Sequence, residues 1–338
     1  IMKKIKNLLP AYGIPIILAL GVSIVLFIHM AGINSTPKSE TYRTFYSLTN
    51  GLDGYTNLKT AWQPRIFSTF LAAFISRVSA WVVNKISIPV INSPAELTIA
   101  LWTTGWFLAS GFVSLVTFKQ RSIFYFFGTF AAISFGYLPR LEMAVRVYPW
   151  DLPALFFFTL FMVFWLQKKY WLAFILIPLG VGFKETALIL SIAFLFADLQ
   201  WKQRLRLFLG SILLGFAIKI SIDYFLQLPL FFTMETRVGG NQDASFYLFS
   251  NLYWLKRIMP FFVNAGTLLA LILLPITNKN ILVFKIIAAF FILGNFLFGN
   301  IIEYRIWFEL TPFALYALDI NMYHAPQNNN DLEKSIRA

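Results

Sequence analysis

Long apolar segments dominate the chain, and short polar ones separate them. About 20 apolar residues cross a bilayer as a helix, and fewer suffice where a helix is partly buried in protein. The segments that meet this description cover residues 12–30, 95–118, 123–138, 153–166, 170–182, 186–196, 207–226, 261–276, 281–301 and 306–318. The pattern therefore predicts an all-α polytopic membrane protein with about ten transmembrane helices, several of them short.

Residues 65–85 are also apolar enough to cross, but their periodicity favours another placement. Large apolar side chains recur at helical spacing on one stripe, whereas Ser68, Ser76, Arg77 and Ser79 lie off it. A helix with one apolar face and basic residues at its start, middle and end is typical of the membrane interface. We predict an interfacial amphipathic helix on the outer side, with a further transmembrane helix as the alternative.

Residues 170–182 and 186–196 are both short, and both have basic flanks at the ends that face away from residue 184. This arrangement predicts a hairpin of two short helices whose tip, Phe183-Lys184-Glu185, lies at or just below the outer surface. Charges at such a depth are costly and point to function. The alternative is one long tilted helix with a buried Lys–Glu pair.

Positive charge between the spans recurs on one side of the predicted membrane. These clusters are Lys119/Arg121, Lys168/Lys169, Lys202/Arg204/Arg206, Lys279 and the Lys334/Arg337 tail. By the positive-inside rule this side, with the N-terminus, is cytoplasmic. Of the 15 acidic residues, only Asp198, Asp319, Asp331 and Glu333 fall there. We expect one membrane domain over residues 1–320, with outer loops 31–94 and 227–260, and a polar cytoplasmic tail over 321–338.

Composition removes several classes of function. With 58% hydrophobic and 13% charged residues, the chain is not a water-soluble enzyme. The net charge of +13 is largely explained by orientation and does not indicate a nucleic-acid partner. Because there are no cysteines and two histidines, disulfides, thiol nucleophiles and multi-His metal sites are excluded. The chemistry must rest on carboxylates, Arg, Lys, Tyr, Trp and backbone.

Four stretches bring charged and aromatic residues to the predicted outer face. They contain Glu40, Asp53 and Arg65; Arg140, Arg146, Tyr148 and Asp151; Lys184 and Glu185; and Glu303, Arg305 and Glu309. Arg binds phosphate oxygens as a fork and Lys binds them as a point charge, while a carboxylate deprotonates an acceptor hydroxyl. The pattern therefore favours a lipid-linked phosphate or diphosphate substrate. Arg305 and Glu309 are spaced to pair on one helix face, as are Lys219 and Asp223.

The layout resembles the GT-C superfamily of membrane glycosyltransferases, and more narrowly the GT-C-like proteins of bacterial polysaccharide loci. The resembling phrases are Gln63-Pro64-Arg65-Ile66, Tyr148-Pro149-Trp150-Asp151-Leu152-Pro153, Gly182-Phe183-Lys184-Glu185-Thr186, and Glu303-Tyr304-Arg305 with Glu309 and Pro312. The likeness covers roughly residues 1–320 in layout. It implies a polyprenyl-phosphate-linked sugar donor, a saccharide acceptor, and transfer on the outward face of the bacterial plasma membrane.

Family members place a catalytic acid in the first outer loop, usually within an acidic pair. The candidates here are Asp53 and Glu40, and since neither has an acidic neighbour, the sequence does not indicate a divalent cation. The residues expected to bind the donor phosphate are Arg65, Arg140, Arg146, Lys184 and Arg305. Those expected to support the site or the acceptor are Tyr148, Asp151, Glu185, Glu303 and Glu309.

Two other functions are open on the sequence. The charged tip at Lys184 and Glu185 is also compatible with a transporter or flippase for a lipid-linked or anionic substrate. The unpaired acid of the first loop is also compatible with a non-catalytic membrane subunit of a larger complex.

Overall fold

The computed structural model describes residues 66–86, 91, 93–118, 121–137, 150–225, 271–298 and 304–323, and the single positions 17, 21, 23, 24, 45 and 46. All regular structure within these ranges is helical. The helices are α4 (Ile66–Lys85), α5 (Pro94–Phe118), α6 (Ser122–Tyr137), α7 (Asp151–Leu166), α8 (Tyr170–Phe183), η2 (Glu185–Phe196), α9 (Trp201–Phe225), α14 (Lys279–Phe298), η4 (Tyr304–Leu310) and α15 (Thr311–Tyr323). The predicted spans 12–30 and 261–276 lie largely outside the described residues.

Three of the described stretches are long and apolar enough to cross a membrane, namely Phe67–Lys85, Pro94–Ser114 and Trp201–Tyr224. Shorter apolar helices accompany them, among them Asp151–Leu166 and Tyr170–Phe183. The expected all-α class is confirmed for the described residues, and these helices mark the chain as a membrane protein. The finer topology of ten crossings stays a prediction.

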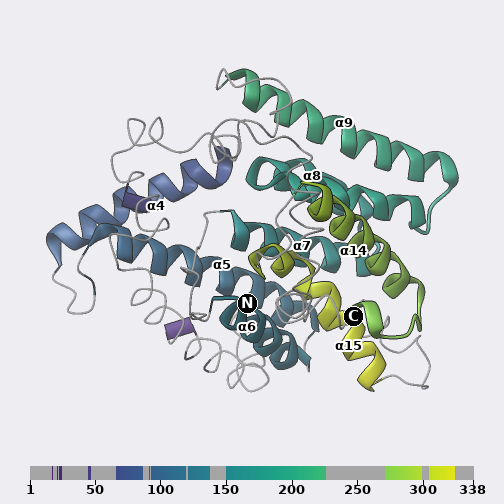
Figure 1. Cartoon of the computed structure of the whole chain (residues 1–338), viewed down its shortest axis with the longest axis horizontal. Helices are drawn as coiled ribbons and strands as arrows, with labels where there is room; N and C mark the ends of the chain where they lie inside the picture. Colours follow the sequence, from purple (N-terminus) through teal and green to yellow (C-terminus); the bar gives the residue numbers. More distant parts are fainter. Residues whose placement is uncertain are drawn as a thin grey trace, which may run out of the picture. The chain divides into compact units, whose positions relative to one another are not determined.

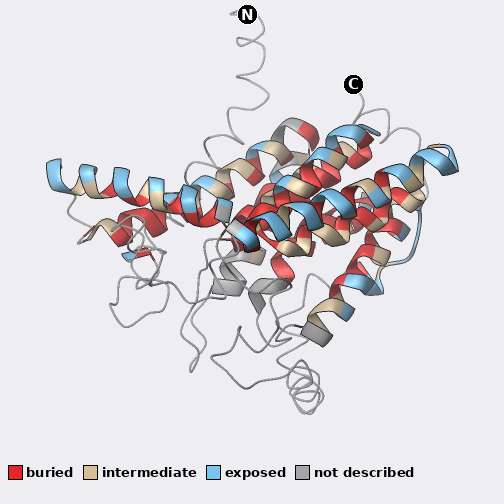
Figure 2. Cartoon of the chain, turned by 90° about the horizontal axis from the view of Figure 1, so that it is seen from above, coloured by how far each residue is buried: buried red, intermediate tan, exposed pale blue. Residues whose placement is uncertain are grey.

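The outward faces of α8 and α9 are apolar. Trp171 and Ile175 on α8 are 69% and 50% exposed, and Leu213 on α9 is 68% exposed. Buried positions gather on the facing sides of the helices and exposed positions on the outer sides (Figure 2). Contiguous apolar surface of this kind is costly in water and suits a hydrocarbon surrounding.

The chain divides into two compact units, one of residues 1–54 and 72–148 and the other of residues 55–71 and 149–338. In the first, α5 and α6 pack through aromatic rings. Phe107 and Phe126 have centroids 4.9 Å apart, and Phe118 stacks on Tyr125 at 3.7 Å. Gly111 permits this approach, because a Cβ there would lie 2.7 Å from the Phe126 ring.

In the second unit, α7 is the central helix. It is apolar on all sides, which is the pattern of a fully buried helix, and nearly all of its side chains are buried. Its neighbours are α8, η2, η4 and α15, with α9 outside α8 and η2 (Figure 1). Rings of Phe291 and Phe313 pack against Phe158 of α7 at 6.1 and 5.9 Å. The functional residues described below lie at the ends of these helices.

The predicted hairpin is confirmed, and the alternative of one long helix is wrong. Helix α8 ends at Phe183, Lys184 is extended with φ −157° and ψ 129°, and η2 packs back against α8. The second leg is a 3₁₀ helix, which the sequence pattern did not predict. At about 2.0 Å per residue its 12 residues span about 24 Å, against about 21 Å for the 14 α-helical residues of α8. The stretched second leg thus matches the height of the first.

Helix α4 forms where it was expected, but its faces are used differently. Its small polar side chains are inside, with Ser68, Ser76 and Ser79 each 0% exposed, whereas Phe74 and Trp81 are each 64% exposed. Small residues that pack on protein while large apolar ones face outward are typical of helices within membranes. The serine stripe is therefore not a water-facing surface, and it no longer favours an interfacial position over a crossing one.

At one end of the second unit, an aspartate pairs with two lysines from separate segments. Asp198, between η2 and α9, accepts from Lys168 at 2.8 Å and from Lys279 at 2.5 Å. Lys168 follows α7 and Lys279 begins α14, so these segments lie at one end of the unit. The sequence had placed these basic residues together, and the contacts confirm that grouping. Which side of the membrane they face stays a prediction.

Candidate functional site: a buried lysine between two carboxylates

A charged cluster lies where the hairpin turns. The Lys184 Nζ donates to Asp151 Oδ1 at 3.2 Å and also to Glu309 Oε1. The hydroxyl of Thr186 donates to the second oxygen of Glu309, Oε2, at 2.5 Å. We call Asp151, Lys184, Thr186 and Glu309 the Lys184 cluster.

Three separate segments supply these side chains. Asp151 is the first residue of α7, where a carboxylate interacts favourably with the helix N-terminus. Lys184 and Thr186 flank the break between α8 and η2, and Glu309 lies in η4. Since Pro153 lies in the first turn of α7, its missing N–H removes no helical hydrogen bond.

The cluster is almost completely enclosed. Lys184 is 5% exposed, Asp151 1% and Glu309 0%. An isolated charge in such a place is strongly unfavourable, and pairing with hydrogen bonds offsets much of that cost. The ion pairs therefore hold the hairpin tip, the start of α7 and η4 in one fixed arrangement.

Aromatic packing closes the hairpin beside the cluster. Phe183 meets Phe157 of α7 at 5.0 Å and Phe67 of α4 at 5.9 Å between ring centroids. The Ser68 hydroxyl donates to the Phe183 carbonyl at 3.3 Å, so the first turn of α4 is attached to the tip. Gly182 makes room for this contact, because a Cβ there would lie 2.2 Å from the Phe67 ring.

The structure brings part of the predicted outer-face set together. Asp151, Lys184 and Glu309 meet, and Glu185 lies half-buried beside them. Lys184 was expected to face a donor phosphate; its ammonium instead lies buried between two carboxylates. The predicted residues outside the described part are Glu40, Asp53, Arg65, Arg140, Arg146, Tyr148 and Glu303. For Arg305 the structure describes the helix but not the side chain.

The Arg305–Glu309 pair expected from their spacing stays a prediction, because the side chain of Arg305 lies outside the described residues. Residues 304–310 form a 3₁₀ helix, in which positions three apart, not four, share a face. Each Glu309 oxygen already accepts a hydrogen bond, one from Lys184 and one from Thr186. The other predicted pair is confirmed, with Lys219 Nζ 2.7 Å from Asp223 Oδ1 on α9.

Two residues that the sequence reasoning missed complete this picture. The sequence pattern assigns Thr186 to an apolar helix. Its hydroxyl, two residues after Lys184, was the feature that could have indicated a hydrogen bond at the charged tip. For Asp198 the sequence predicts only the cytoplasmic side of the membrane, but the carboxylate binds two lysines. Their hydrogen bonds lower its pKa from 3.8 to about 2. Within the described ranges, no three His, Cys, Asp or Glu residues lie together as a metal site.

No protein-family model, curated protein or solved structure matches this chain. The chemistry of the site itself is therefore the basis on which its function is inferred.

Proposed function

We propose that the chain is a multi-pass membrane glycosyltransferase of the GT-C type, with its active side facing outward. In this proposal it moves a sugar from a polyprenyl-phosphate-linked donor to a saccharide acceptor in the cell envelope. The observation that carries the proposal is the Lys184 cluster, an enclosed ionic group inside an apolar helical unit. Ionisable groups in such places are costly and mark functional sites by default.

The position of the cluster supports an assembly role. Asp151 directly follows the segment that carries Arg140, Arg146 and Tyr148, and Glu309 follows Glu303 and Arg305 closely in sequence. Lys184 holds together Asp151 and Glu309, the two residues that follow these cationic segments in the sequence. In this proposal Lys184 is therefore a positioning residue and not itself a phosphate ligand.

The chemical step in this proposal belongs to the first outer loop. Asp53, with Glu40 as the other candidate, removes the proton from the acceptor hydroxyl as that oxygen attacks the anomeric carbon of the donor sugar. The bond to the polyprenyl phosphate breaks, and the arginines stabilise the charge that develops on the leaving phosphate.

The test uses the full chain in lipid nanodiscs with polyprenyl-phosphate-linked hexose and pentose donors, and measures the release of polyprenyl phosphate. Asp53→Asn should lower turnover by about 100-fold or more, because a general base contributes about that factor. Its thermal unfolding should match the wild type. The matched control is Asp243→Asn, which removes a carboxylate from the other large predicted outer loop and should keep full turnover.

Two results would count against the proposal. Full turnover by both the Asp53→Asn and the Glu40→Gln variant would exclude these two residues as the general base. If a chain that unfolds cooperatively cleaves none of the donors tested, the proposed transferase activity is excluded.

The confirmed hairpin gives a transporter a specific observation in its favour. Discontinuous helices with charged breaks form substrate and ion sites in membrane transporters. Proteoliposomes distinguish the two: a flippase moves a fluorescent polyprenyl-phosphate lipid between leaflets with the lipid chemically unchanged, whereas the transferase consumes its donor.

A further inference from the structure

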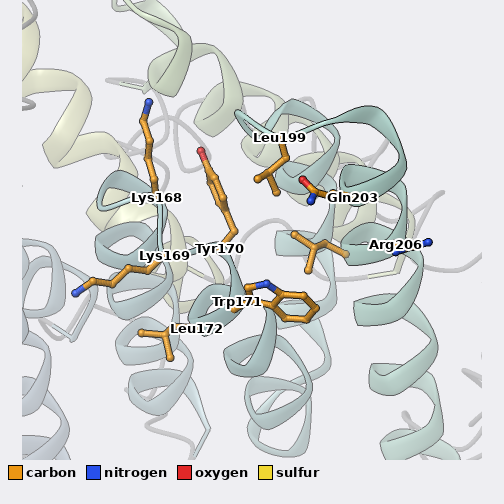
Figure 3. Close-up of a pocket in the computed structure, with 9 residues that line it drawn as sticks. Lys168, Lys169, Tyr170, Trp171, Leu172, Leu199, Gln203 and Arg206 are labelled. Atoms are coloured by element: carbon orange, nitrogen blue, oxygen red, sulfur yellow. The ribbon is translucent and has the colours of Figure 1, made fainter.

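A pocket of about 500 Å³ lies at the end of the second unit that carries Asp198, away from the Lys184 cluster. It opens between the first turn of α8 and the first turns of α9. Its lining includes apolar Trp171 and Leu207 and polar Lys169, Gln203 and Arg206. The charged ends of Lys169 and Arg206 point outward on opposite sides of Trp171 (Figure 3). Its chemistry is that of an amphipathic ligand with an anionic end.

The backbone at the pocket is arranged to receive an anion. Lys169 is the N-cap residue of α8, and no side-chain hydrogen bond caps this end. Tyr170, Trp171 and Leu172 of this turn all line the pocket. A helix N-terminus favours a phosphate, and exposed Lys169 and Arg206 add positive charge on the two sides of the pocket (Figure 3).

A tight turn carries the two lysines that line the pocket. Lys168 has φ 57°, in the left-handed region, and its N–H bonds to the Trp165 carbonyl at 2.9 Å while the Lys169 N–H reaches Phe164 at 2.9 Å. This pair of bonds is a Schellman motif at the end of α7. Both lysines line the pocket, and Lys168 in addition pairs with Asp198.

The surface below the pocket is suited to acyl chains. Leu172, Ile175 and Leu179 on α8 are 43%, 50% and 45% exposed, and Leu209 and Leu213 continue the apolar surface on α9. The basic residues also predict that this end faces the cytoplasm, where anionic lipids concentrate. A soluble phosphate compound would make no use of the apolar strip.

We propose that this pocket binds the head group of an anionic phospholipid, with its phosphate at the N-terminus of α8 between Lys169 and Arg206 and its acyl chains along α8 and α9. Trp171, 69% exposed, lies at the level of the head group, as interfacial tryptophans do. This site is independent of the Lys184 cluster and of the proposed glycosyl transfer.

The test titrates the full chain in detergent with short-chain phosphatidylglycerol, phosphatidylcholine and inorganic phosphate, and reads affinity by native mass spectrometry. Phosphatidylglycerol should bind best. Arg206→Gln should weaken it about five-fold and Lys169→Gln/Arg206→Gln about 25-fold, since each cation near a charged lipid surface contributes about five-fold. Lys202→Gln removes an exposed charge from the same turn of α9 but lies outside the pocket lining, and should change affinity by less than two-fold.

A second readout does not depend on the charge variants. Phosphatidylglycerol with brominated acyl chains should quench the fluorescence of the wild type more than that of Trp171→Phe, with the difference lost for brominated phosphatidylcholine. The proposal is overturned if phosphatidylcholine or inorganic phosphate binds as tightly as phosphatidylglycerol. Equal losses in Lys202→Gln and Arg206→Gln, or quenching that Trp171→Phe does not alter, would also overturn it.

Discussion

The contribution of a charged side chain to the stability of this protein depends on its ion-pair partners and on its burial. Lys184 and Asp198 both join charges from separate segments, but Lys184 is 5% exposed, whereas the Asp198 side chain is 44% exposed. Burial sets the consequence of breaking each pair, because a charge left alone in the interior cannot be hydrated. The two residues therefore call for different experiments.

Replacing Lys184 alone should destabilise the protein strongly. Lys184→Met leaves the carboxylates of Asp151 and Glu309 without this cation, and breaking a buried pair in this way costs about 3–5 kcal/mol. Adding Asp151→Asn and Glu309→Gln to the variant should restore most of the loss. Unfolding by denaturant in mixed micelles measures both effects.

The matched control for this prediction is Lys202→Met, which removes an exposed lysine and should change the free energy of unfolding by less than about 0.5 kcal/mol. If Lys184→Met unfolds like that control, the cluster contributes nothing to stability.

The Asp198 pairs should make stability depend on pH in the acid range. Because the folded pKa is about 2 against 3.8 when unpaired, the pairs stabilise the folded state above about pH 4, and this contribution disappears as pH falls toward 2. Asp198→Asn should therefore be less stable than wild type at pH 7, and the difference should shrink below pH 4 and vanish as the pH approaches 2. Thermal unfolding midpoints across this range measure the difference, which for exposed pairs is within about 1 kcal/mol.

Removing both partners should have the same result as removing the acid. Lys168→Gln/Lys279→Gln returns the Asp198 pKa toward its ordinary value, so its pH profile should follow that of Asp198→Asn. Parallel profiles for wild type and Asp198→Asn between pH 7 and pH 3 would contradict the assignment.

At the scale of elements, the hairpin of α8 and η2 depends on close backbone approach at its tip. Gly180 and Ala187 lie on the two legs, and a Cβ on Gly180 would lie 2.8 Å from the Cβ of Ala187. The Lys184 N–H also bonds to the Gly180 carbonyl at 2.7 Å. A small residue here lets the chain reverse within the apolar unit and brings Lys184 to its partners.

Gly180→Ala should destabilise the protein by about 1–3 kcal/mol, the usual cost of overpacking a core contact that cannot move aside. Gly105→Ala is its control, because no atom lies within 4 Å of a Cβ built in that part of α5. That variant should be neutral or more stable, by up to about 1 kcal/mol. Thermal unfolding in detergent compares the two, and equal behaviour would mean that the hairpin legs are not in contact at Gly180.

At the scale of the whole molecule, the absence of cysteine makes topology directly testable. Single cysteines are introduced at Asn241, Lys202, Lys59 and Asn92, and intact cells are treated with a membrane-impermeant maleimide. Asn241→Cys should be labelled and Lys202→Cys protected, because the basic residues place the two on opposite sides. Label at Lys202→Cys would reverse the predicted orientation.

The same experiment determines the placement of α4. An interfacial helix leaves Lys59→Cys and Asn92→Cys both accessible from outside, whereas a crossing helix protects one of them. We expect both to be labelled, because a crossing would move Lys3, Lys4 and Lys6 to the outer side against the positive-inside rule.

The sequence by itself determined the membrane class, the break at Lys184 and the common end of Lys168, Lys279 and Asp198. Hydrophobicity and charge are local properties, and they determine separately for each segment whether it enters the bilayer and on which side its ends lie. It also predicted that Asp151, Lys184 and Glu309 belong to one region, since all three lie at the same ends of predicted spans.

Only the tertiary structure decided how these residues meet. Thr186 and Glu309 are separated by 123 positions, so their hydrogen bond depends on packing among α7, η2 and η4. The buried serine face of α4 and the 3₁₀ form of η2 also depend on tertiary packing. Neighbouring helices determine which face of a helix is buried and what length its partner helix must span. Local patterns place segments relative to a membrane, whereas contacts between distant segments determine what each charge faces.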